Sequence, residues 1–411
     1  MTAPFERRLE RYAELLVRVG VNLQPGQRLL LSADLDAAPL ARQVVRHAYL
    51  AGAPLVNVIW NDAESTRLRL LHAAPDTLAD FPGWRAQLWQ DTAERGDAFL
   101  HVTSEDPALL AGLAPDLVDR ERRGRQRSLQ GFADLMRRNA FPWCRAAAPA
   151  PAWAARVYPD LPAAQAVSRL WNAVFHANRV DLPDPVQAWR DHLAALEARA
   201  ALLTARQYRA VHLQGPGTDL EVGLADGHVW VGGASPTPAG VPFAANMPTE
   251  EIFTAPHRTR VTGTVRATKP LSLSGTLVEG IEMRFEAGRI VHARADRGEE
   301  VLRRALDTDE GARFLGEVAL VPGASPVAET GTLFLDSLYD ENVACHLAFG
   351  YAFQENFAGG DQLTRDEVAA RGGNDSLTHV DFMVGSADVT VDGLRGDGSR
   401  EPLLRDGQWV F

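Results

Sequence analysis

The chain has 411 residues, of which 46% are hydrophobic and 23% are charged, a balance typical of globular domains. This length exceeds what one hydrophobic core usually supports, so we expect two or three domains. The formal net charge is −11 and no basic stripe is present, which argues against a nucleic-acid partner. The only cysteines, Cys144 and Cys345, are too few for a disulfide framework or a cysteine-built zinc site. Any metal would therefore need ligands from His, Asp and Glu.

The first residues, MTAPFERRLERYAELL, carry charges where a signal peptide needs an apolar segment. No apolar stretch of the sequence approaches the roughly 18 residues of a membrane-spanning helix. We therefore expect a cytoplasmic protein without a membrane partner.

Helix and strand patterns alternate up to about residue 205. Apolar residues at helical spacing predict a helix over 5–19 that ends at Gly20. Short apolar runs then predict buried strands, and amphipathic segments predict the helices between them. In chain order we expect a strand at RLLLSA (28–33), a helix at 36–51, a strand at PLVNVIW (54–60), a helix at 84–96, a strand at DAFLHVTS (97–104), and helices at 114–139, 162–179 and 184–205. This alternation predicts an α/β N-terminal domain, residues 1–205, with a helix-covered, mostly parallel sheet.

After Arg206 the sequence changes to strand-like runs joined by turns. GPGTD at 215–219 is a glycine turn between two strands, and the dipeptide at 226–227, Asp-Gly, signals a hairpin. We expect further strands within 260–294 and at 317–321, a helix at 298–307, and a helix at about 340–353 that precedes the strand HVD. These patterns predict an α+β C-terminal domain, residues 206–411, with a mixed, largely antiparallel sheet.

Four groups of carboxylates and histidines lie in this second half. They are the adjacent Glu250 and Glu251, the single Glu317, Glu341 with His346, and His379 with Asp381. Each group alone has an ordinary explanation: a solvated loop, a surface strand end, a helix start or a core histidine. Together they supply enough N and O ligands for two divalent metals that share one carboxylate.

The pair His379 and Asp381 shows the pattern most clearly. Alternate residues of a strand point to the same face, so this imidazole and this carboxylate lie roughly 6.6–7 Å apart on one side. Cys345 beside His346 suggests a thiol nucleophile instead. On a helix, however, neighbouring side chains diverge by about 100°, which places that pair poorly for cysteine–histidine chemistry.

Several long blocks carry a resemblance to a known family. PTEEIFTAPHR, LVEGIEMRFEAG, LDTDEGARFLGEVALVP, LYDENVACHLAFG and RGGNDSLTHVDFMVGS closely resemble the thermophilic metallo-aminopeptidase family, the aminopeptidase T, AmpS and PepS type. RLWNAVFHANRVD and GPGTDL extend the likeness, so that it covers nearly the whole chain. The resemblance implies a two-domain, metal-dependent exopeptidase with two catalytic divalent ions and a dimeric assembly.

The resemblance also implies roles for individual residues. It implies six metal ligands, of which Glu317 is the bridging carboxylate: Glu250, Glu317, Glu341, His346, His379 and Asp381. Glu251 is then the candidate general base, and the two adjacent glutamates could exchange roles. We expect zinc or cobalt first, although manganese and magnesium also suit such ligands.

One position departs from the family pattern. The family usually carries a tyrosine seven residues after the histidine at 346, where this chain has Phe353. Tyr351 lies two residues earlier, and in a continuing helix it would be rotated by about 200°, away from the metals. The departure puts the rate of catalysis in doubt more than the class of enzyme.

From these observations we expect a homodimeric aminopeptidase that removes single residues from peptides with a free N-terminus. Two alternatives stay open. One is a metal-dependent amidase or esterase on the same site, and the other is a non-catalytic dimeric homologue that binds peptides or metals. The sequence does not predict which N-terminal residue is preferred.

Overall fold

The computed structural model describes residues 4–104, 106–273 and 275–411, and these form two compact units. One unit comprises Met1–Leu193 and Ala234–Pro248, and the other comprises Ala194–Gly233 and Thr249–Phe411. The predicted domain boundary at 205/206 stays a prediction. Residues 234–248 join the first unit through the last strand of its sheet. The Arg145 N–H donates to the carbonyl of Ala245 at 2.8 Å, and the Met247 N–H donates to that of Arg145 at 2.9 Å.

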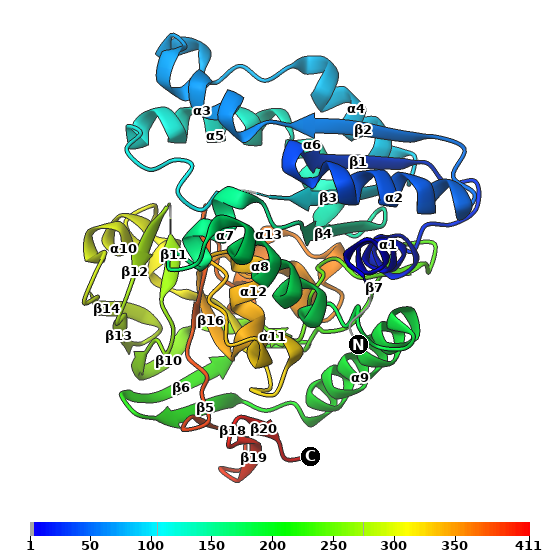
Figure 1. Cartoon of the computed structure of the whole chain (residues 1–411). Coiled ribbons are helices and arrows are strands. Elements are labelled where there is room, and N and C mark those ends of the chain that lie inside the picture. Colours follow the sequence, from blue (N-terminus) through cyan, green and yellow to red (C-terminus); the bar gives the residue numbers. More distant parts are fainter. Residues whose placement is uncertain (1–3, 105, 274) are drawn as a thin grey trace. The chain divides into compact units, whose positions relative to one another are not determined.

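A parallel sheet forms the centre of the first unit (Figure 1). Its strand order is β2 (Val56–Asn61), β1 (Leu29–Asp34), β3 (Ala98–Thr103), β4 (Trp143–Ala147), and the neighbouring strands are paired in parallel. Most residues of β1 and β3 are buried, as expected for strands that are covered on both faces. The predicted helix-covered parallel sheet is confirmed.

Helices occupy most of the chain between and after these strands. They are α1 (Phe5–Leu15), α2 (Ala38–Leu50), α3 (Ala63–His72), α4 (Gly83–Glu94), α5 (Pro115–Ser128), α6 (Gln130–Arg137), α7 (Pro151–Val157), α8 (Ala163–Ala177) and α9 (Pro185–Arg206). The helix predicted over 114–139 is two helices, α5 and α6, because the backbone leaves helical geometry at Leu129. No helix among the described residues is both long enough and apolar enough to cross a membrane.

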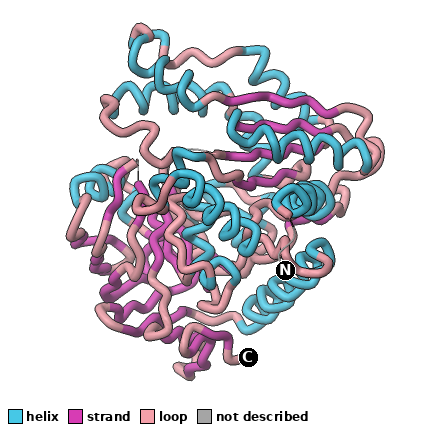
Figure 2. The backbone as a smooth tube through the Cα atoms, in the orientation of Figure 1, coloured by secondary structure: helices cyan, strands magenta, loops and turns pink. Residues whose placement is uncertain are grey.

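The second unit is built mainly from antiparallel strands, which the tube in Figure 2 shows in magenta. The larger sheet has the order β14 (Arg289–Arg294), β13 (Glu282–Glu286), β10 (Pro256–Arg266), β6 (Thr218–Leu224), β5 (Ala210–Gly215), β18 (Thr390–Leu394), β19 (Arg400–Arg405), β20 (Gln408–Trp409). The smaller sheet has the order β17 (His379–Met383), β16 (His346–Gly350), β15 (Leu315–Leu320), β9 (Ile252–Thr254). Buried residues of both sheets form one apolar cluster, and α10 (Glu299–Leu306) packs against it. The predicted largely antiparallel second half is confirmed.

The helix predicted at about 340–353 is wrong. The chain forms only the short helix α12 (Ser337–Asp340) and a single 3-10 turn, Glu341–Val343, before it enters β16. All five residues of β16 are buried, and the strand lies between β15 and β17. A strand that is covered on both faces shows a continuous apolar run, which periodicity alone cannot distinguish from a buried helix.

Candidate metal centre

The register of the smaller sheet places three residues in a row across neighbouring strands. Glu317 of β15 lies opposite Ala348 of β16, and Ala348 lies opposite Asp381 of β17. Residues that are paired in this way point to the same face of a sheet. The two carboxylates therefore flank an alanine whose side chain is a single methyl group, which leaves space above the sheet between them.

Alternation along the strands adds three more side chains to this face. His346 lies two residues before Ala348, and His379 lies two residues before Asp381, so both imidazoles join the carboxylates. On the other side, Ala319 of β15 is paired with Phe253 of β9. Glu251 lies two residues before Phe253 and continues the same alternation.

Distances confirm that five of these side chains meet. His346 Nε2 lies 3.1 Å from Glu251 Oε2 and 3.2 Å from Glu317 Oε1. His379 Nε2 lies 3.4 Å from Glu317 Oε2 and 3.4 Å from Asp381 Oδ1. Two groups of ligand atoms result, Glu251–Glu317–His346 and Glu317–His379–Asp381, with the atoms of each group within 4.8 Å of one another. Glu317 belongs to both groups and offers a different oxygen to each histidine.

The other two predicted ligands, Glu250 and Glu341, lie outside the two groups of ligand atoms. Glu250 is buried, but it has the opposite strand phase to Glu251, and its backbone N–H donates to Asn342 Oδ1 at 2.6 Å. Neither three-residue group includes it. Glu341 also lies outside these two groups, but its charge interacts with Glu251, Asp381 and His346, which places it beside the cluster.

A hydrogen bond and two aromatic rings hold His379. Its Nδ1 donates to the carbonyl of Tyr351 at 2.7 Å, which leaves Nε2 to face Glu317. The rings of Tyr351 and Phe353 lie 4.8 and 4.9 Å from the imidazole, between ring centroids. The expectation that Tyr351 points away from the site is therefore wrong, because residues 351–353 are not helical. A strand-phase interpretation of this segment would have placed both rings on one side.

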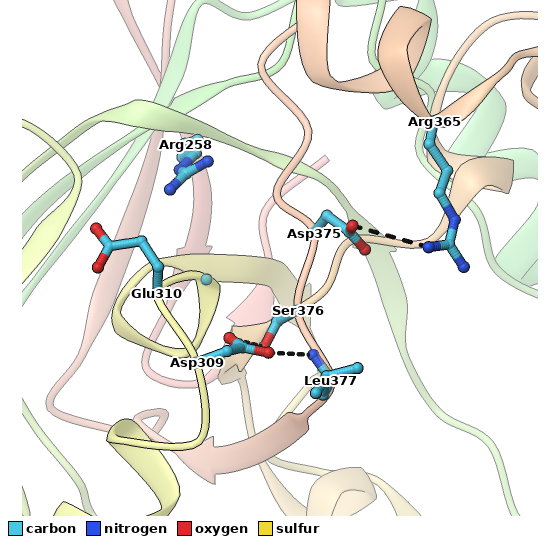
Figure 3. Close-up of a pocket in the computed structure, with 8 residues that line it drawn as sticks. Arg258, Asp309, Glu310, Arg365, Asp375, Ser376 and Leu377 are labelled. Carbon is cyan, nitrogen blue, oxygen red and sulfur yellow. Dashed lines mark hydrogen bonds and ion pairs between the residues drawn. The ribbon is translucent and has the colours of Figure 1, made fainter. Parts of the chain in front are cut away.

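The loop before β17 is fixed by Asp309. This carboxylate accepts hydrogen bonds from the Leu377 N–H at 2.6 Å and from the Ser376 hydroxyl at 2.8 Å (Figure 3). These contacts set the start of the strand that carries His379. A hollow of about 430 Å³ lies beside the loop, and its lining includes charged side chains such as Arg258 and Arg365 but none of the predicted site residues.

Burial and crowding oppose the ionisation of two carboxylates of the cluster. Burial raises the pKa of Glu251, although its contact with His346 acts in the opposite direction. Burial, followed by the negative charges of Glu251 and Asp381, raises the pKa of Glu341 well above its usual value. With only the protein's own charges present, both groups therefore hold their protons to a higher pH than an ordinary glutamate does.

The histidines respond in the opposite sense to their surroundings. Burial acts to lower the pKa of His346, but the neighbouring Glu251 and Glu317 raise it well above its ordinary value. Burial likewise acts to lower the pKa of His379, and the neighbouring Asp381 and Glu317 raise it. Burial acts to raise the pKa of Glu317, yet contacts with both imidazoles lower it overall. The two imidazoles thus favour the ionised form of the shared carboxylate.

These properties fit divalent cations. Four carboxylates and two imidazoles in one partly buried cluster leave an excess of negative charge, which is costly unless cations or protons compensate it. Oxygen and imidazole nitrogen are suitable ligands for zinc, cobalt and manganese. The methyl side chain of Ala348 leaves room between Glu317 and Asp381.

Comparisons with known proteins agree with this chemistry. The sequence profile of the thermophilic metalloprotease (M29) family matches residues 5–409. Aminopeptidase T of Thermus thermophilus is 48% identical over 406 residues, and aminopeptidase AmpS of Bacillus subtilis is 40% identical over 407 residues, each match covering 99% of both chains. The solved structure of wild-type AmpT from Thermus thermophilus superposes with a TM-score of 0.94 over 99% of this chain and 100% of that chain. The chain therefore belongs to the thermophilic metalloprotease (M29) family, as its sequence blocks predict.

Proposed function

We propose that this protein is a metal-dependent aminopeptidase that uses two divalent cations to release single N-terminal residues from peptides. The observation that carries the proposal is the shared carboxylate: Glu317 presents one oxygen to each of two histidine-containing groups on one sheet face. The aminopeptidase names of relatives that are 40–48% identical over nearly the full chain support the reaction class.

The ligands in this proposal come from β15, β16 and β17, from the residue that precedes β9, and from the turn before β16. Glu251, Glu317 and His346 hold one cation, and Glu317, His379 and Asp381 hold the other. Glu341 adds a further carboxylate beside them. Glu251 thus takes the ligand role that the sequence resemblance gave to Glu250, because strand phase directs Glu251 to the sheet face with the histidines. When bound, such cations polarise the scissile carbonyl and lower the pKa of water.

The chain's own groups supply the proton transfers and the preference for a free amine. A proton has to pass from the attacking water to the leaving amine, and a carboxylate with a raised pKa can hold it in transit. Glu341 lies beside the two ligand groups without belonging to either, and Glu251 belongs to one of them, so these two carboxylates are the candidates for this transfer. A cation or a carboxylate of this site could bind a free α-amine, whereas an acetylated N-terminus offers neither a basic nitrogen nor a positive charge, so a free N-terminus should be preferred.

The test combines metal analysis with two matched substrates. Dialysis against a chelator should abolish hydrolysis of a free peptide, and added zinc or cobalt should restore it. The N-acetylated form of the same peptide should not be cleaved, while the free form should lose one residue at a time. Cleavage of the blocked peptide would favour a general amidase or esterase. Metal binding without any turnover would favour a non-catalytic binding protein.

The stoichiometry has its own test. Glu317→Gln should lose both cations, since its carboxylate belongs to both groups, whereas His379→Ala should mainly lose one. Metal-to-protein ratios after gel filtration measure this difference. If each variant retains one cation, Glu317 is a terminal ligand of a single site. We also propose a cytoplasmic homodimer, which sedimentation analysis of the purified protein and cell fractionation would test.

A further inference from the structure

A second polar site lies in the first unit, on its parallel sheet. Ser32 of β1 is paired with His101 of β3, and His101 is paired with Arg145 of β4, so the three side chains share one face. On the same face, two residues earlier, Leu30 and Phe99 lie in an apolar cluster. The polar residues thus follow the apolar ones toward the carboxyl ends of the strands.

Hydrogen bonds connect this row to helix α4. Asn61 Nδ2 donates to Ser32 Oγ at 3.0 Å, and the guanidinium of Arg85 donates to Asn61 Oδ1. The asparagine amide is therefore turned so that its oxygen faces the arginine. We call Ser32, Asn61, Arg85, His101 and Arg145 the basic strip.

Within the basic strip, the positive charge of Arg85 lacks a carboxylate partner among the described residues. The Arg85 side chain is buried enough that its Nε–H is shielded from solvent, and that N–H has no hydrogen-bond acceptor among the described residues. Burial, followed by the charge of Arg125, lowers the pKa of Arg85. Burial and the charges of Arg145, Arg125 and Arg85 lower the pKa of His101 to about 4. The imidazole is thus neutral at neutral pH, with one N–H to donate and cationic neighbours around it.

The position in the fold is also one where sheets of this type bind ligands. The strand order is β2-β1-β3-β4, so the chain passes from β1 to one side and then crosses to the other side at β3. In open α/β sheets, ligands bind beyond the carboxyl ends of the strands at such a switch point. Ser32 and His101 belong to the two strands that flank it.

We propose that the basic strip binds an oxyanion, either a phosphate group or a carboxylate, independently of the metal centre. Arg85 Nε–H, the His101 N–H and the Ser32 hydroxyl can each donate a hydrogen bond, and Arg85 supplies positive charge. An oxyanion satisfies these donors and compensates the charge of Arg85, which is one of the charges that lower the pKa of His101. A cationic or apolar ligand does neither.

The experiment observes His101 directly in the metal-loaded, full-length protein. Selective isotope labelling of histidine gives NMR signals, and the His101→Gln variant identifies the signal of His101. Titration with inorganic phosphate, and separately with acetate, should shift this signal saturably. A response to phosphate alone identifies a phosphate site, and an equal response to acetate identifies a carboxylate site.

Matched charge variants decide whether the strip is responsible. Arg85→Met should weaken binding about tenfold or more, because it removes a charged donor. Arg46→Met removes the same charge from the exposed pair with Glu10 and should leave binding unchanged. Ser32→Ala should weaken binding severalfold, and it decides the question if Arg85→Met fails to fold. The proposal is overturned if neither anion gives a saturable shift, if Arg85→Met and Ser32→Ala bind as the wild type does, or if Arg46→Met weakens binding equally.

Discussion

Strand phase distinguishes two adjacent residues that are chemically identical. Glu250 and Glu251 could not be assigned from the sequence, because both are glutamates in the same block. Pairing of β9 with β15 fixes the phase, and it directs Glu251 to the sheet face with the histidines. A register is a property of two distant segments, so it cannot be found in either segment alone.

The assignment predicts different outcomes for two isosteric changes. Glu251→Gln should lower the affinity for one cation by at least about 100-fold, since it removes a charged ligand that contacts His346. Glu250→Gln, the matched control, should retain both cations, because its side chain lies outside both ligand groups. Metal content by mass spectrometry after extensive dialysis measures both. Loss of a cation in Glu250→Gln but not in Glu251→Gln would restore the original assignment.

The rings beside His379 lead to a second prediction at the residue scale. Tyr351 and Phe353 both contact the imidazole and limit its rotation. Phe353→Ala should therefore lower cation affinity about tenfold, an effect typical of lost support around a metal ligand. Tyr351→Phe keeps the ring and should keep the affinity, which makes it the control. Equal affinities of wild type and Phe353→Ala, measured by competition with a fluorescent chelator, would show that Tyr351 and the backbone hydrogen bond suffice.

At the scale of elements, the sequence predicted most helices and strands of the first half and failed at one fully buried strand of the second. β16 reads HLAFG, with every residue buried, and its apolar run carries no period. The error affected the interpretation of the site. On a helix, the side chains of Tyr351 and Phe353 would point in different directions, about 200° apart. By contrast, β17 keeps polar and apolar residues in alternation, and its shared His379–Asp381 face was predicted from the sequence and is found in the structure.

The strand assignment makes Ala348 a testable part of the centre. Ala348→Val adds two methyl groups between Glu317 and Asp381, where paired side chains lie only about 4.5–5.5 Å apart. We expect the variant to lose the cation of the Glu317–His379–Asp381 group. The protein should stay folded, because valine favours strands. Circular dichroism and metal content check the two parts. If residue 348 lay on a helix facing elsewhere, the substitution would leave both cations bound.

At the scale of the whole molecule, segments far apart in the chain build both compact units. Residues 234–248 follow two strands of the second unit, yet they pair with Arg145 in the first. The amino-acid composition does not indicate this return of the chain to the first unit. The composition changes near residue 206, where strand-like runs begin. The family blocks, in contrast, were recognisable because each is a long local pattern, and the family match over 5–409 confirms them.

The stability of the whole chain should depend on pH differently with and without cations. In the cation-free protein, Glu251 and Glu341 have raised pKa values, so the stability linked to their protons is present at low pH and lost as the pH rises through those values. His346 and His379 also have raised pKa values and act in the same direction. The lowered pKa of Glu317 acts in the opposite direction. Four of the five shifted groups of the cluster thus favour stability at low pH, and one opposes it.

Bound cations reverse this dependence, because protons compete with them less as the pH rises. Each site that is occupied at 100 times its dissociation constant adds about 2.7 kcal/mol to the free energy of unfolding. We therefore expect the difference in Tm between metal-loaded and chelated protein to widen from about pH 6 to about pH 8.5. Differential scanning calorimetry measures it, with Glu317→Gln as the variant in which the difference should shrink at every pH. A difference that narrows with rising pH would mean that the buried carboxylates and histidines are not the groups that bind the cations.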